Sequence, residues 1–389
     1  MRSVAVLAAC QAFGMSCMAL SITITALVGA SLAPAASLAT LPLALQFVAT
    51  AAATIPVSLL MGRFGRRAGF VLGSLAGIVG GVVSCLAVFL ADFWLFCCGA
   101  AFIGVFATHV ALFRFAAAEV AGAEQRSRAI SYVMIGGVVA AVLGPQLAKW
   151  TKGVFAPIDF AGGYAAMAVL AFLILILVQF VALPRPLSAR ERSGGRPLAE
   201  IARQPALIVA VLCAMVAYGS MNLVMVSTPL AMDACGHPFD SAAFVIQWHA
   251  LGMFAPSFVT GHIIHRFGPL PVIAVGGLLI LGCAAVNLTG IEVLQFWGAL
   301  VLLGIGWNFM FIGGTTLLTE TYRPEEQSRV QAMNEFLVFG TTALTALASG
   351  ALFSGLGWEA VNLGIVIPVA GATAAALWLA RRRPSAVAT

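Results

Sequence analysis

Ser58-Leu-Leu-Met-Gly-Arg-Phe-Gly-Arg-Arg-Ala-Gly69 is a short basic turn between two strongly apolar runs. A related stretch, Gly261-His-Ile-Ile-His-Arg-Phe-Gly-Pro269, follows about 200 residues later. Apolar runs of the length that flanks each turn are not stable in water. The two turns therefore indicate places where successive membrane-spanning helices meet.

The composition supports this interpretation for the whole chain. Of the 389 residues, 61% are hydrophobic and 9% are charged, whereas roughly a quarter of the residues in soluble domains are charged. The net charge of +6 does not indicate a nucleic-acid partner, because the basic residues are dispersed over short loops. The sequence therefore predicts an integral membrane protein.

Runs of about 20 apolar residues are long enough to cross a bilayer as helices, and the chain contains twelve of them. None shows the alternation of a membrane β-strand, and the first, although preceded by Arg2, is too long for a signal peptide. The runs are Val4 to Ala30, Ala39 to Met61, Phe70 to Leu90, Phe93 to Val120, Ile130 to Trp150, Phe160 to Leu183, Ala206 to Met232, Ser241 to Ile264, Pro271 to Leu288, Val293 to Thr319, Val330 to Phe353 and Val361 to Ala380.

The distribution of basic residues predicts the orientation. On alternating spans, 17 of the 20 Lys and Arg residues fall on one side, Lys149 and Lys152 fall on the other, and Arg114 lies within a span. The positive-inside rule then places both termini in the cytoplasm. The eight cysteines lie mostly within spans without metal-type spacing, so we expect buried thiols and no metal site.

The two halves of the chain resemble each other in the same direction. Glu119 to Arg128 matches Glu320 to Arg329 at an offset of 201, as Gln46 matches Gln247, and Arg63-Phe-Gly65 matches Arg266-Phe-Gly268 at 203. We expect two six-helix halves, 1–183 and 205–389, joined by a polar cytoplasmic linker, 184–204. Parallel repeats of this kind place a substrate site between the halves near the bilayer midplane.

Twelve spans, the repeat, the central linker and the Arg-Phe-Gly-Arg-Arg turn after the second span resemble the major facilitator superfamily over essentially the whole chain. The resemblance implies an all-α membrane protein with 12 transmembrane helices in two pseudo-symmetric six-helix bundles. In that family the turn usually reads Gly-x-Leu-Ala-Asp-Arg-x-Gly-Arg-Arg. Here Ser58 stands for the first glycine and Gly62 stands for the aspartate.

The resemblance also implies roles for the two turns. The family arginine pairs with an acid at the cytoplasmic end of span four, so we expect Arg63 to pair with Glu119 and Arg266 to pair with Glu320. Gly65, Arg66, Arg67 and Gly268 complete the two turns. Alternatively, Arg63, Arg66 and Arg67 serve only as topology charges. The missing acid at Gly62 predicts a weaker link from the turn to span eleven.

Arg114 is the residue that most directly suggests chemistry. A charged side chain inside a span is costly and by default indicates a functional site, and Glu335 in span eleven lies at a similar depth. We expect the two either to bridge the halves or to serve substrate and proton together, although Arg114 could simply bind backbone carbonyls. His109 could titrate near physiological pH or act as a structural hydrogen-bond donor.

Further polar and aromatic residues lie in the spans, and the family lines its cavity with spans one, four, seven and ten. Aromatic faces beside amides suit a planar or amphipathic organic molecule. The candidates are Gln11, Gln46, Tyr218, Asn222, Gln247, Trp248, His249, Trp307 and Asn308.

The direction of transport is less clear from the sequence. Gly144-Pro145 in span five resembles the core of the family's antiporter motif, but Ala140 and Ala148 stand where the fuller motif has glycine. An arginine early in span four, common in proton-coupled drug exporters, is replaced by Ala100.

The sequence contains no Walker loop, metal cluster or Ser/His/Asp arrangement, so we expect neither an enzyme nor a cofactor. We predict a monomeric secondary transporter of the cytoplasmic membrane that moves a small organic solute by alternating access, coupled to protons, with export of amphipathic compounds slightly favoured. The alternatives are uptake of an anionic or planar aromatic metabolite such as a vitamin, and a non-transporting receptor or assembly factor on the same scaffold.

Overall fold

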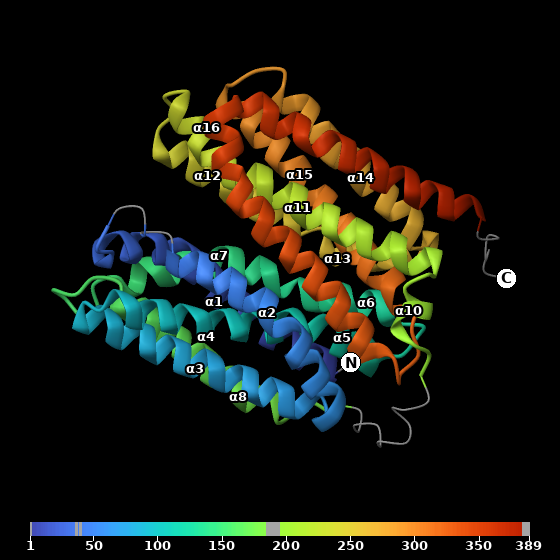
Figure 1. The fold of residues 1–389 in the computed structure, drawn as a ribbon, viewed down its shortest axis with the longest axis horizontal. Coiled ribbons are helices and arrows are strands. Elements are labelled where there is room, and N and C mark those ends of the chain that lie inside the picture. Colours follow the sequence, from blue (N-terminus) through green and yellow to red (C-terminus); the bar gives the residue numbers. More distant parts are fainter. Residues whose placement is uncertain (1, 36–37, 39–40, 184–194, 383–389) are drawn as a thin grey trace. The chain divides into compact units, whose positions relative to one another are not determined.

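The computed structural model describes residues 2–35, 38, 41–183 and 195–382. In these residues all assigned secondary-structure elements are helices, in agreement with the predicted all-α fold class (Figure 1). Each of the twelve predicted runs falls on one helix or on two consecutive helices. The predicted start at Ala39, most of the linker and Arg383 lie outside the described residues.

The chain forms two compact units. The first contains Met1–Gly194 and Gln327–Phe339, and the second contains Gly195–Glu326 and Gly340–Thr389. The first turns of span eleven thus pack with the first unit, although they follow span ten in the sequence. The predicted halves, 1–183 and 205–389, remain a prediction.

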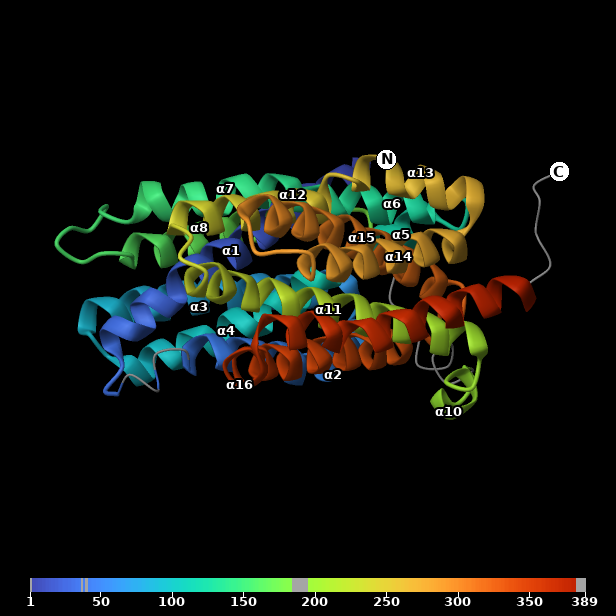
Figure 2. The same ribbon diagram turned by 90° about the horizontal axis from the view of Figure 1, so that it is seen from above.

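The first unit holds spans one to six, and spans four and five are each interrupted by a single residue. Within this unit α1, α3, α4 and α8 run alongside one another (Figure 1, Figure 2). Its helices are α1 (Arg2–Leu32), α2 (Leu41–Phe64), α3 (Arg66–Leu90), α4 (Phe93–Ala111), α5 (Phe113–Ala121), α6 (Arg126–Met134), α7 (Gly136–Thr151) and α8 (Ala161–Val178).

The second unit holds the later spans. Pro256, which has no backbone N–H, interrupts span eight between α12 and α13. Its helices are α10 (Leu198–Ile201), α11 (Pro205–Ala234), α12 (Phe239–Phe254), α13 (Ser257–Phe267), α14 (Pro269–Asn287), α15 (Val293–Thr319) and α16 (Gln327–Arg382), whose first turns belong to the first unit.

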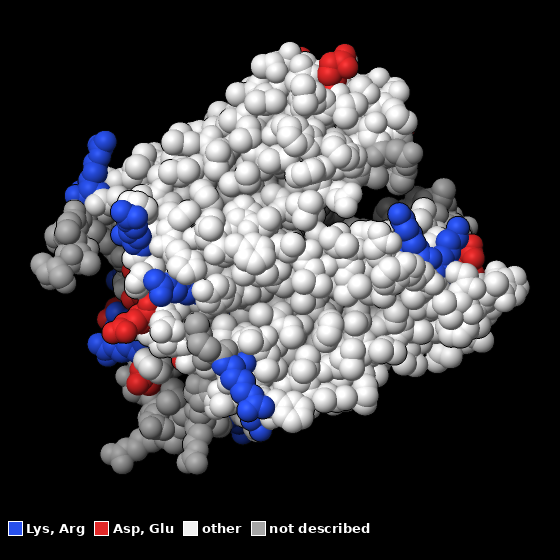
Figure 3. Space-filling model, turned by 180° about the vertical axis from the view of Figure 1, so that it is seen from behind, with Lys and Arg blue, Asp and Glu red and all other residues white. Residues whose placement is uncertain are grey.

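Ten helical stretches in the described residues are long and apolar enough to cross a membrane. The other two predicted spans are the interrupted α12–α13 pair and the first leg of α16. The chain reverses direction within α16 at Gly357, whose φ of 82° is left-handed, and the two legs fold back on each other (Figure 1). On the face drawn in Figure 3, charged side chains gather towards the left and right of the view, with an acidic group at the top, and the broad area between them carries none.

The two units repeat one packing scheme. In the first unit α4 packs against α2 and α3, and in the second α15 packs against α12 and α14. A Cβ added at Gly104 in α4 would strike the backbone of Gln46 in α2, and one at Gly304 in α15 would strike the backbone of His249 in α12. Small residues at corresponding positions let each central helix approach its neighbour closely.

Candidate functional site

The interruption of span four at Leu112 leaves the carbonyl of Ala111 without its usual helical partner. In a regular helix the amide of Phe115 would bond to the carbonyl four residues earlier, but here it bonds to Leu112, with an N–O distance of 3.2 Å. The carbonyl of Ala111 instead accepts a hydrogen bond of 2.7 Å from Nη1 of Arg114. The arginine thus satisfies a backbone group that the interruption releases.

The same guanidinium forms a buried ion pair with span eleven. Nη2 of Arg114 lies 2.5 Å from Oε1 of Glu335, and the two side chains are only 4% and 1% exposed. Nδ2 of Asn334 donates to the same oxygen at 2.7 Å, and the guanidinium carbon of Arg114 lies 4.6 Å from the centre of the Phe115 ring. The two charges that the sequence analysis placed at similar depth are therefore in contact within one unit.

The other acceptor atoms of this group are buried without a partner among the described residues. They are Oε2 of Glu335 and Oδ1 of Asn334. A buried acceptor that lacks a donor costs about 1–3 kcal/mol, and more if it is charged. The Arg114–Glu335–Asn334 cluster, which we call the inner cluster, thus combines charge balance with two unmet acceptors.

The basic turn makes a second ion pair with span four, at Glu119, five residues after Arg114. Arg66 makes a two-pronged contact with Glu119, from Nε to Oε2 at 3.2 Å and from Nη2 to Oε1 at 2.5 Å. The sequence analysis predicted that Arg63 pairs with Glu119, and the structure instead places Arg66 on this carboxylate. Gly65, with φ of 89°, separates α2 from α3, and Arg66 is the first residue of α3.

Arg66 also connects the turn to span eleven, because it donates to Gln331. A Cβ at Gly62 would overlap the side chain of Ser328, so the turn packs directly on span eleven at the position where the family has an acid. The weaker link expected from the missing acid stays a prediction. Ser328, Gln331 and Glu335 recur at a spacing of three and four residues, which is one helix face. That spacing could have identified Gln331 from the sequence.

Asn308, predicted to face substrate, is instead bound to the interrupted span eight. Its Nδ2 donates to the carbonyl of Met253 at 2.6 Å and to Oγ of Ser257 at 2.7 Å. Its Oδ1 accepts from Thr260 at 2.7 Å. The amide is fully buried, and these bonds stabilise the helix at its break.

Trp307 forms the centre of an aromatic cluster in the second unit. It stacks on Phe311 with ring centres 4.9 Å apart and makes edge contacts with Tyr218 and Phe254 at 5.2 and 5.7 Å. Tyr218 is half-buried. Nearby in the sequence, Asn222 donates to the carbonyl of Thr342 at 3.1 Å. Trp307 and Phe311 are fully buried, so the structure brings the aromatic residues of spans seven and ten together, and their role towards a substrate stays a prediction.

The remaining candidates lie at separate places. Gln46 accepts from Ser21 at 2.7 Å, Gln11 is buried with no partner for its Oε1 in the described structure, and Nδ1 of His109 lies 2.8 Å from the carbonyl of Val105. A carbonyl can only accept, so this nitrogen of His109 carries the proton, as in the structural interpretation.

Span eight places its three candidates on different faces. His249 is fully buried with Nδ1 2.9 Å from the carbonyl of Leu300, whereas Gln247 and Trp248 are exposed. In span five, Gly144 of the antiporter-like motif approaches Ala19 of α1. The Arg266–Glu320 pair remains a prediction.

Comparison with known proteins assigns the family. The model of the Major Facilitator Superfamily matches residues 4–333 and 210–389. The chain belongs to the major facilitator superfamily. It is 41% identical, over 95% of its own length and 93% of the relative's, to the riboflavin transporter RfnT of Brucella anthropi. It is 27% identical to the uncharacterized transporter YdeG of Bacillus subtilis over 93% of this chain and 88% of the relative.

Solved structures of the superfamily share the fold. The proton:xylose symporter XylE matches with a TM-score of 0.79 at 15% identity, covering 98% of this chain and 95% of that one. The human organic anion transporter MFSD10 matches with 0.78 at 14% identity, covering 96% and 99%. The family match, rather than these structures, makes the chain a multi-pass membrane protein and a secondary transporter, as the sequence predicted.

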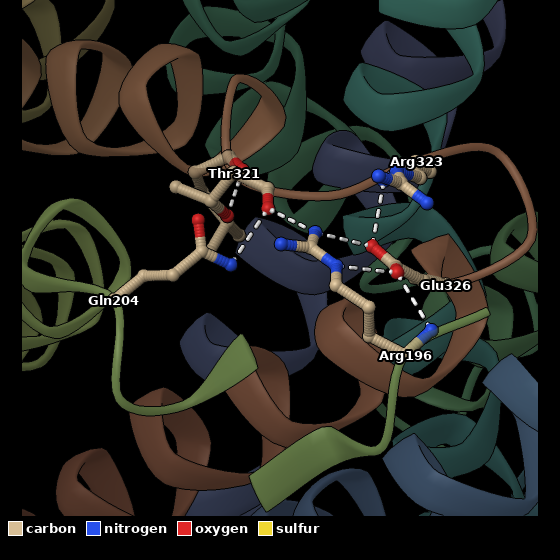
Figure 4. A network of polar contacts seen from close by, with 6 residues as sticks. Arg196, Gln204, Thr321, Arg323 and Glu326 are labelled. Atoms are coloured by element: carbon tan, nitrogen blue, oxygen red, sulfur yellow. Dashed lines mark hydrogen bonds and ion pairs between the residues drawn. The ribbon is translucent and has the colours of Figure 1, made fainter. Parts of the chain in front are cut away.

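In this transporter the end of the linker is fixed to the loop between spans ten and eleven, a contact that the sequence analysis missed. Glu326, whose side chain is fully buried, accepts from the backbone, Nε and Nη2 of Arg196 at 2.9, 2.8 and 2.7 Å, and from the amide of Arg323 at 2.9 Å (Figure 4). Gln204 donates to Thr321 at 3.1 Å. The hydrogen bonds from Arg196 lower the pKa of Glu326 to about 2.

Proposed function

We propose that this transporter carries riboflavin, or a flavin with the same ring system, into the cell across the cytoplasmic membrane. The observation that carries the proposal is the relation to a riboflavin transporter at 41% identity over 95% of the chain. The match covers both chains almost completely, so the relation is one between whole transporters rather than between fragments.

The aromatic cluster around Trp307 supports a planar substrate. The isoalloxazine ring of riboflavin is a flat tricyclic system with polar edges. Aromatic side chains pack favourably on such rings, whereas amides and hydroxyls orient the polar edges. The half-buried Tyr218, in contact with Trp307 and Phe311, supplies an aromatic surface of this kind.

The inner cluster supports coupling to protons. Glu335 is a buried carboxylate held by one arginine, and intramembrane carboxylates are typical elements of proton pathways. Alternating access by the two predicted halves, with both termini in the cytoplasm, completes the proposed mechanism. The sequence analysis slightly favoured export, but we propose import because the antiporter-like motif is only partial, with Ala140 and Ala148 in place of glycine.

The proposal is tested in a bacterial strain that can neither synthesise nor import riboflavin. Expression of the wild-type chain should restore growth at low external riboflavin, and Arg114→Ala should not. Equal surface expression of the two proteins, measured on membrane fractions, is the control. Growth that stays dependent on high external riboflavin despite wild-type protein in the membrane would refute flavin import, and faster loss of preloaded riboflavin would indicate export.

A further inference from the structure

We infer that the inner cluster recognises the imide edge of the flavin ring, with Oε2 of Glu335 accepting the imide N–H. This inference rests on the proposed function and adds the substrate group that is recognised and the residue that selects it. It starts from the two acceptors of the cluster, Glu335 Oε2 and Asn334 Oδ1, which are buried and have no donor among the described residues.

The unmet oxygen of Glu335 calls for a hydrogen-bond donor, and the guanidinium of Arg114 beside it can face an acceptor. Oε1 of Glu335 already accepts from Arg114 at 2.5 Å and from Asn334 at 2.7 Å, whereas Oε2 has no donor among the described residues. The second oxygen therefore requires an N–H or O–H group. The guanidinium beside it is a planar donor that suits carbonyl oxygens.

The pyrimidine part of the isoalloxazine ring carries the matching pattern. Its imide presents carbonyl, N–H and carbonyl in one plane, so the N–H faces the carboxylate oxygen while a flanking carbonyl faces the guanidinium of Arg114. Sugars lack this edge, and simple apolar amphiphiles also lack it. The inner cluster would therefore favour flavins and related imide-bearing heterocycles over other organic solutes.

The geometry around the cluster is fixed before any substrate arrives. The bond from Arg114 to the Ala111 carbonyl and the stacking on Phe115 hold the guanidinium plane from two sides. Asn334 holds the carboxylate of Glu335 from the neighbouring position on the same helix. Preorganised donors and acceptors make binding less costly, because fewer groups lose freedom when the ligand binds.

The test compares riboflavin with N3-methylriboflavin, in which a methyl group replaces the imide hydrogen. Binding to the purified transporter in lipid nanodiscs is followed by flavin fluorescence. A hydrogen bond to a buried charged acceptor predicts that wild-type protein binds the methylated flavin about 10- to 100-fold more weakly. For Glu335→Gln, which keeps only a neutral acceptor, the ratio should fall to about two- to tenfold.

Two further variants serve as controls for the binding ratio. Arg114→Met/Glu335→Met removes both charges together, avoids leaving one buried charge unpaired, and should bind both flavins equally. Glu119→Gln breaks the half-buried Arg66–Glu119 ion pair of the same unit and should leave the wild-type ratio unchanged.

The outcomes separate the two proposals. If wild-type protein binds riboflavin but binds the methylated flavin equally well, the imide inference fails and flavin transport stands. The inference also fails if Glu335→Gln keeps the full wild-type ratio, since another group then selects the imide and Glu335 serves the proton alone. If wild-type protein binds neither flavin, the proposed function itself fails.

Discussion

Breaking the inner ion pair from one side should harm the transporter more than removing it altogether. Arg114 and Glu335 are almost fully buried, and their charged atoms approach to 2.5 Å. Charge centres about 4 Å apart attract by about 4 kcal/mol at an effective dielectric constant of 20, and much of that gain is spent on removing both groups from water. Leaving one charge behind costs about 3–5 kcal/mol, whereas replacing both with apolar side chains is often nearly neutral.

The assay is thermal unfolding of purified variants in one detergent. Arg114→Met alone should lower the midpoint most, because it strands the carboxylate and the Ala111 carbonyl. Glu335→Gln should have a smaller effect, since glutamine retains an acceptor for Arg114. Arg114→Met/Glu335→Met should recover most of the loss. If the double variant is destabilised by the sum of two large single effects, the residues do not act as a pair and the reasoning is refuted.

Three further predictions concern other contacts. The pKa of Glu326 is lowered from 4.5 to about 2, so its stabilising contribution is complete above about pH 4.5 and is lost as the pH falls towards 2. The unfolding midpoint of Glu326→Gln should therefore depend less on pH in that window than that of the wild type. An unchanged acid profile would contradict this. Asn308→Leu leaves a buried carbonyl at the break in span eight and should cost about 2–4 kcal/mol, measured by thermal unfolding; a neutral result would deny Asn308 its structural role. Gly62→Ala should destabilise by about 1–3 kcal/mol because its Cβ meets Ser328, whereas Gly340→Ala, which meets nothing within 4 Å, should be neutral or stabilising; equal effects would argue against the packing of span eleven on the turn.

The spans and the family could be predicted from the sequence because the bilayer restricts the chain to long apolar helices. The interruption at Pro256 could not be predicted from the proline alone, because Pro56, Pro145 and Pro229 lie inside continuous helices. The interruption at Leu112 could not be predicted either, because no glycine or proline lies there. The structure explains the interruption at Leu112 by the hydrogen bond from Arg114 to the carbonyl of Ala111.

The site could be predicted only in part, because hydropathy gives the depth of a residue but not the direction of its side chain. Depth was enough to relate Arg114 to Glu335. It was insufficient to choose between Arg63 and Arg66 as the partner of Glu119. The family's cavity-lining spans also suggested Asn308 as a substrate residue, whereas its amide is hydrogen-bonded to span eight.

Riboflavin flux into proteoliposomes that contain only the purified transporter is the most direct test of the central claim. Vesicles with an outside-acidic pH gradient should accumulate riboflavin above its external concentration, and abolishing the gradient should reduce entry to equilibration. Vesicles with correctly inserted protein that take up no more riboflavin than protein-free vesicles, with or without the gradient, would contradict the account.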